Sequence, residues 1–133
     1  MYKNILIPTD GSPLSRKAAA NGTKLANLVG ARVTGFYAAP PATPLEHAHG
    51  IEEAAAEYLS VIDEAAKAAG VPCETVSVTN DFPADAIIAA AKKHGCDLIF
   101  IASHGRHGFR DSMLGTQTQK VLAQSPVPVL VDR

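Results

Sequence analysis

The sequence contains no tryptophan, and aromatic residues make up only 5% of its 133 residues, whereas hydrophobic residues make up 47%. A core built mainly from Ala, Val, Ile and Leu suits helices packed closely against a sheet. The formal net charge is −1 and no long run of one sign occurs, so the broad positive surface typical of nucleic-acid binding is absent. No extended polar low-complexity segment occurs either, which argues against a disordered chain.

Long apolar runs are also missing. The apolar run near the first residue is only four residues long, and no run approaches the length of a membrane span. We therefore expect neither a secretory leader nor a membrane helix, and we expect a cytoplasmic location. The two cysteines, Cys73 and Cys96, match no metal or redox spacing, so we expect reduced and mostly buried thiols.

Apolar runs alternate with helical patterns along the chain, which predicts one domain over residues 1–133. Strands are predicted at residues 4–9, 31–39, 73–80, 97–103 and 126–133. Helices are predicted at residues 13–30, 51–69, 83–94 and 115–124. Ser12 is expected to cap the first helix, with Pro13 in its first turn and Gly30 at its end. Its apolar stripe is expected to consist of Leu14, Ala18, Leu25 and Leu28.

Five strands alternating with four helices predict an α/β fold, in which helices cover both faces of a parallel sheet. Right-handed crossovers and one reversal of the winding give a single doubly wound, Rossmann-like domain with strand order 3-2-1-4-5. The third and fifth strands are expected at the edges, the third half-buried and the fifth beginning with two prolines. Residues 40–50 contain three prolines and are expected to form neither helix nor central strand.

Such sheets bind ligands beyond the carboxyl ends of their strands, where the winding reverses. This places the segment "PTDGS" after the first strand beside "ASHG" after the fourth. Asp10 is expected either to accept hydrogen bonds from a ribose or an adenine amine, or to brace its own turn. The loop that ends at Thr116 is not a Walker A loop, because no Lys precedes Thr116. A dinucleotide-binding G-x-G-x-x-G motif is excluded as well, because none follows the first strand.

The predicted helix that begins at Gly115 offers a second feature. The first amide hydrogens of a helix lack partners within it, and with the helix dipole they favour an anion such as phosphate. A glycine lets the phosphate approach the backbone, and Gly105 supplies a second such position. Thr116 either caps the helix or offers its hydroxyl to the ligand.

Three stretches, "ILIPTDGS", "ASHGRHGFRDSMLGTQTQKVL" and "PVPVLV", resemble the universal stress protein family, and the resemblance spans the whole chain. The nucleotide-binding branch of that family carries G-x2-G-x9-G-[ST]. In this sequence the motif falls on Ala102, Gly105, Gly115 and Thr116, and Ala102 is its one departure. The resemblance implies ATP or a related adenine nucleotide, with Mg²⁺ as an optional companion.

The resemblance also implies where the nucleotide lies. The base and ribose would contact the end of the first strand and Ala38, which matches the family's adenine contact, and the phosphates would contact the glycines, Thr116 and Gln117. The full candidate set is Pro8, Thr9, Asp10, Ala38, Ile101, Ala102, Ser103, His104, Gly105, Arg106, Gly108, Gly115, Thr116 and Gln117.

The resemblance implies a homodimer as well. The last strand, from Val127 to Asp132, is apolar and β-branched, and a bare edge of that kind invites aggregation. The same strand of a second copy, related by a two-fold axis, would cover it.

The sequence leaves two possible roles open for several other polar residues. Arg106, His107 and Arg110 either screen the phosphates or form a solvated loop, and His104 either donates to a phosphate or satisfies loop carbonyls. His47 and His49 lack the additional ligands that a metal site needs.

No nucleophile with an oriented base is recognisable, so no catalytic residue is assigned. A phosphotransfer receiver is excluded, because Asp10 lacks an acidic partner and no Lys follows the fifth strand. The leading hypothesis is a stress-response protein that senses or carries ATP. The alternative is a dimeric interaction module with a vestigial pocket, and no residue requires slow ATP hydrolysis or self-phosphorylation.

Overall fold

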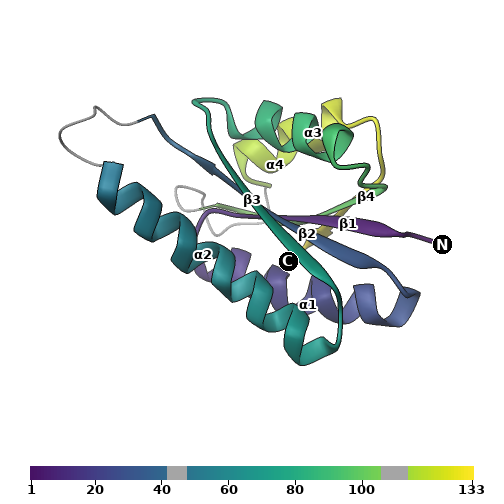
Figure 1. Cartoon of the computed structure of the whole chain (residues 1–133). Helices are drawn as coiled ribbons and strands as arrows, with labels where there is room; N and C mark the ends of the chain where they lie inside the picture. Colours follow the sequence, from purple (N-terminus) through teal and green to yellow (C-terminus); the bar gives the residue numbers. More distant parts are fainter. Residues whose placement is uncertain (42–47, 106–113) are drawn as a thin grey trace.

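The structure, a computed structural model, describes residues 1–41, 48–105 and 114–133. Strands and helices alternate along this part of the chain (Figure 1). The elements are β1 (Asn4–Thr9), α1 (Pro13–Val29), β2 (Arg32–Ala39), α2 (Ala48–Ala69), β3 (Cys73–Thr79), α3 (Pro83–Lys93), β4 (Leu98–Ala102), α4 (Thr116–Gln124) and β5 (Val129–Asp132).

The strands form one parallel sheet in the order β3-β2-β1-β4-β5, which confirms the predicted α/β fold and strand order. Helices α1 and α2 cover one face, and α3 and α4 cover the other (Figure 1). The central strand β1 is buried along its whole length, with Ile5 and Ile7 in the core under α1 and α2, and Leu6 in the core under α3 and α4. Because side chains alternate, each strand end can present residues to both faces.

Helix α1 begins and ends as expected. The Ser12 side chain accepts a hydrogen bond from the Ser15 amide at 3.2 Å, and Gly30 ends the helix with a left-handed φ of 73°. The expected apolar stripe is wrong at Leu28, which is 82% exposed. The buried face of α1 is made of small residues, and a Cβ on Gly22 would lie 2.7 Å from Ile7 Cδ1, so the helix lies too close to the sheet for a stripe of leucines.

Two boundaries differ from expectation by three residues, and several others by one. Helix α2 begins at Ala48 rather than Ile51, so the last residues of the proline-containing segment are helical. Strand β5 begins at Val129 rather than Pro126. Pro128 cannot donate to the ladder, but its carbonyl accepts a hydrogen bond from the Ile99 amide at 3.0 Å and leads the chain into β5.

Strand β3 lies at the edge, as expected, but it is more exposed than a half-buried strand, because only β2 pairs with it. Both cysteines are free thiols, as expected, but only Cys96 is buried, whereas Cys73 at the start of β3 is half-buried. Burial raises the pKa of both thiols. In the described part of the chain, no helix is both long and apolar enough to cross a membrane.

Candidate functional site

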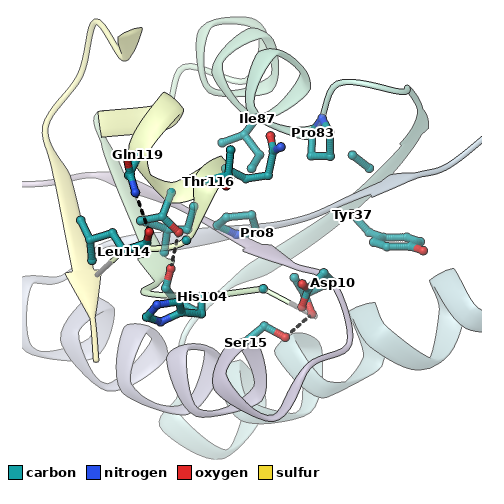
Figure 2. Close-up of a pocket in the computed structure, with 18 of the residues that line it drawn as sticks. Pro8, Asp10, Ser15, Tyr37, Pro83, Ile87, His104, Leu114, Thr116 and Gln119 are labelled. Carbon is teal, nitrogen blue, oxygen red and sulfur yellow. Dashed lines mark hydrogen bonds between the residues drawn. The ribbon is translucent and has the colours of Figure 1, made fainter. Parts of the chain in front are cut away.

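A cavity of about 640 Å³ lies at the carboxyl ends of β1, β2 and β4, where the winding of the sheet reverses (Figure 2). Loop residues, strand ends and the first turns of α3 and α4 all contribute to its wall. The lining residues are Pro8, Thr9, Asp10, Ser15, Tyr37, Ala38, Pro40, Tyr58, Pro83, Ile87, Ile101, Ala102, His104, Gly105, Leu114, Gly115, Thr116, Gln117, Thr118 and Gln119.

Most of the residues singled out in the sequence lie in this wall. Those that do are Pro8, Thr9, Asp10, Ala38, Ile101, Ala102, His104, Gly105, Gly115, Thr116 and Gln117. Ser103 is 4% exposed and is not part of the lining. The remaining candidates, Arg106 and Gly108, lie outside the described residues, as do His47, His107, Arg110 and the side chain of His49.

At the end of β1, hydrogen bonds hold the turn into α1. The Asp10 carboxylate accepts from the Ser12 amide through Oδ1 at 2.9 Å, and the Thr9 hydroxyl lies 3.1 Å from that of Ser15. Asp10 therefore braces its own turn, one of its two expected roles. Its Oδ2 reaches across to β4, where a Cβ on Gly105 would lie only 2.5 Å from it. The absence of a side chain on Gly105 is what allows this approach.

Gly115 packs against the end of β4 in a similar way. Its amide donates to the Ser103 carbonyl at 2.8 Å, and a Cβ there would lie 3.2 Å from His104 Cα. The Thr118 hydroxyl donates to the Ala102 carbonyl at 2.8 Å. These contacts fix the start of α4 onto the end of β4. The packing of the fold therefore requires glycine at both Gly105 and Gly115, even without a ligand.

The start of α4 has the features of an anion site. Gly115 is its N-cap and offers no side-chain hydrogen bond, so Thr116 stands in the first turn and is not the cap. The backbone amides of that turn therefore receive no bond from a capping side chain, and Thr116, Gln117 and Thr118 all line the cavity. Among the described lining residues Asp10 is the one carboxylate, and neither Lys nor Arg occurs.

Gln117 has a partner that the sequence did not reveal. Its side-chain oxygen accepts a hydrogen bond from the Ala84 amide at 3.1 Å. Helix α3 needs this acceptor, because its own N-cap residue, Phe82, provides no side-chain hydrogen bond. Gln117 thus caps α3 from α4, and it connects two helices that both face the cavity.

His104 is 5% exposed, and its Nδ1 lies 3.1 Å from the Ser103 hydroxyl. Within the described residues, its Nε2 is the one buried side-chain nitrogen or oxygen without a hydrogen-bond partner. In Figure 2 the ring points away from Thr116 and Pro8. The side chain therefore does not face the start of α4, although His104 belongs to the wall.

Ala102, the departure from the glycine motif, is the last residue of β4 and pairs with Asp132 of β5. No residue other than glycine has a positive φ in the described part of the chain, so its methyl group adds no backbone strain. The residue is 6% exposed and belongs to the core under α1 and α2.

The wall also contains side chains that the sequence did not single out. Tyr37 and Pro40 lie at the carboxyl end of β2, a position that the predicted sheet could have marked. Tyr58 in α2 and Pro83 and Ile87 in α3 reach the cavity through helix packing, for which the sequence carries no motif.

Fold and cavity together define a doubly wound α/β protein with a binding cavity at the switch point of its sheet. Residues 1–133 match the universal stress protein family, and the chain belongs to that family, as the sequence predicted. A universal stress protein of Thermus aquaticus is 36% identical over 137 residues, which cover the full length of both chains.

Two solved structures show the same fold. A universal stress protein in complex with cAMP has a TM-score of 0.75 at 24% identity, covering 99% of this chain and 97% of the other. The universal stress protein of Archaeoglobus fulgidus in complex with dAMP has a TM-score of 0.78 at 19% identity, covering 99% of this chain and 98% of the other.

Proposed function

We propose that this chain is a cytoplasmic stress-response protein that binds an adenine nucleotide such as ATP in the cavity and acts as a nucleotide-dependent sensor or regulator. The observation that carries the proposal is the order of chemical groups along one cavity: helix amides, a carboxylate, then an apolar and aromatic wall. The related proteins solved with cAMP and dAMP add support.

The order matches the parts of a nucleotide. The phosphate binds at Gly115 and Thr116, where the amides and dipole of α4 favour an anion. Asp10, between the two ends in Figure 2, accepts hydrogen bonds from ribose hydroxyls. The base then lies at the far end, where Ala38 and Pro40 provide apolar surface.

A triphosphate adds charge that the described wall does not neutralise. In the described part of the chain, no group of three or more His, Cys, Asp or Glu residues is arranged to hold a metal. Mg²⁺ would enter as a companion of ATP and would neutralise part of the phosphate charge. Asp10 is the one carboxylate among the described lining residues that could face it.

Calorimetry with AMP and with Mg·ATP tests the proposal, using Thr116→Glu as the diagnostic variant. Thr116 is exposed in the first turn of α4, where a carboxylate favours the helix but repels a phosphate. We expect Thr116→Glu to fold normally and to weaken binding at least ~10-fold. Gln124→Glu adds the same charge at the other end of α4 and should leave affinity unchanged. If the wild-type chain binds no adenine nucleotide at millimolar concentration, the proposal is wrong.

A second candidate, a dimeric interaction module with a vestigial cavity, is favoured by the contacts of the glycines. Gly105 makes room for the Asp10 carboxylate, and Gly115 makes room for the backbone of His104. Both glycines would be needed without any ligand. This function predicts that the wild-type chain and Thr116→Glu bind no nucleotide but still form the same dimer.

For the assembly we propose a homodimer through the strand from Val127 to Asp132. Strand β5 is an edge of the sheet, and Leu130 on β5 and Leu122 on α4 are 39% and 41% exposed. The Asn21 amide donates to the Asp132 carboxylate at 3.1 and 3.2 Å, which holds the end of the strand in place. Sedimentation should show a dimer that Leu130→Asp converts to a monomer, while Leu28→Asp on α1 does not. A monomeric wild-type chain would contradict it.

A further inference from the structure

Two tyrosines form a wall at one end of the cavity. Tyr37 lies near the end of β2 and Tyr58 lies within α2. Their ring centroids are 5.3 Å apart at an interplanar angle of 90°, the edge-to-face arrangement that aromatic rings prefer. Both residues line the cavity, and we call the pair the tyrosine wall.

The tyrosine wall is placed away from the proposed phosphate site. Figure 2 shows Tyr37 on the opposite side of the cavity from Thr116 and Leu114, with Asp10 between them. Ala38 and Pro40, the lining residues that follow Tyr37 in the sequence, are apolar. A ligand whose anion lies at α4 and whose hydroxyls face Asp10 therefore presents its third part to the tyrosine wall.

An edge-to-face pair can accept a further planar ring. Aromatic rings attract each other through complementary edges and faces, and nucleic-acid bases pack on tyrosine in the same way. Tyr37 is 8% exposed and belongs to the core, whereas Tyr58 is only half-buried. Tyr58 is therefore the ring of the pair with more surface left for a ligand.

We propose that the tyrosine wall reads the base of the bound nucleotide, with Tyr58 as the residue that distinguishes a ligand with a planar heteroaromatic ring from a bare sugar phosphate. This inference rests on the proposed function and deepens it. It assigns the recognition of the base to a residue of α2, outside the glycine motif and outside the ends of the strands.

The test measures AMP and ribose 5-phosphate binding to the same set of variants by calorimetry or ligand-observed NMR. The two ligands share the phosphate and the sugar but differ in the base. We expect Tyr58→Leu to weaken AMP binding about 5-fold and to change ribose 5-phosphate binding by less than about 2-fold. Tyr58→Phe keeps the ring and should retain the affinity for AMP. Tyr2→Leu is the matched control, since Tyr2 precedes β1 at the opposite end of the sheet.

The outcomes separate the two levels of the proposal. If the wild-type chain binds neither ligand, the proposed function fails and this inference falls with it. If the wild-type chain binds AMP but Tyr58→Leu weakens both ligands equally, or weakens neither, this inference alone is overturned. Fluorescence gives an independent readout, since the chain has three tyrosines and no tryptophan. AMP should change the tyrosine emission of the wild-type chain and of Tyr2→Leu, and should change that of Tyr58→Leu much less.

Discussion

The two ends of the cavity are built in different ways. At the start of α4 the wall is backbone, and Gly115 lies so close to β4 that a Cβ would be 3.2 Å from His104 Cα. At the tyrosine wall the lining consists of large side chains, Tyr37 and Tyr58, from two different elements. One end is therefore sensitive to a single added methyl group, while the other is sensitive to the loss of a ring. We therefore expect substitutions that add atoms to destabilise the α4 end, and substitutions that remove a ring to destabilise the tyrosine wall.

The largest effect is expected for Tyr37→Ala. Tyr37 is 8% exposed, and removing a buried aromatic ring costs about 3–5 kcal/mol of unfolding free energy. Tyr37→Phe keeps the ring packed against Tyr58 and should cost only about 1 kcal/mol. Urea unfolding followed by circular dichroism measures both. Equal losses for the two variants would mean that the hydroxyl, and not the ring, stabilises this end.

Next in size is Gly115→Ala, at the backbone end. The added methyl would press on the His104 backbone, which cannot move without shifting β4 or α4, so we expect a loss of about 1–3 kcal/mol. Gly105→Ala should cost less, because the atom it meets belongs to the side chain of Asp10 and not to the backbone. The same unfolding experiment ranks the two glycines. A larger loss for Gly105→Ala would show that the position of Asp10 is the tighter constraint.

The two ends also differed in what the sequence could predict. The strand order followed from the alternation of elements, and the end of α1 followed from Gly30, a turn residue that acts locally. The start of α4 carries a motif with fixed spacing, so Gly115 and Thr116 could be placed in the cavity. Tyr58 could not be placed there, because a residue in the middle of a helix lines a cavity only through the way the helix packs against other elements.

Errors in the sequence analysis have the same origin. Leu28 fits the helical period of α1, yet it is exposed because the contact of Gly22 with Ile7 sets how close the helix lies to the sheet. The phosphate contact expected of Gln117 stays a prediction, and what the sequence did not show is that its side chain accepts a hydrogen bond from the Ala84 amide of α3. Both depend on distances between elements, which no local pattern contains.

A smaller effect is expected for Ala102→Gly, which restores the glycine of the family motif. The change removes a buried methyl group and frees the backbone at the end of β4, so it should cost about 1.5 kcal/mol. Because Ala102 is not strained, restoring the glycine should not increase the affinity for AMP. Unfolding and calorimetry on the same protein check both statements. Tighter binding by the variant would show that the methyl group obstructs the ligand.

The smallest effect is expected for Gln117→Ala, which removes the link between the start of α4 and α3. Loss of the acceptor for the Ala84 amide should cost about 1 kcal/mol, as for other lost helix caps. Hydrogen exchange at Ala84 should accelerate about 5-fold, since each 1.4 kcal/mol corresponds to tenfold. Gln119→Ala is the control, because the Gln119 side chain donates to the Leu114 carbonyl at 2.6 Å, within its own segment. If Ala84 exchanges at the wild-type rate in Gln117→Ala, α3 is capped by another group, and the α4 end of the cavity is independent of the α3 wall.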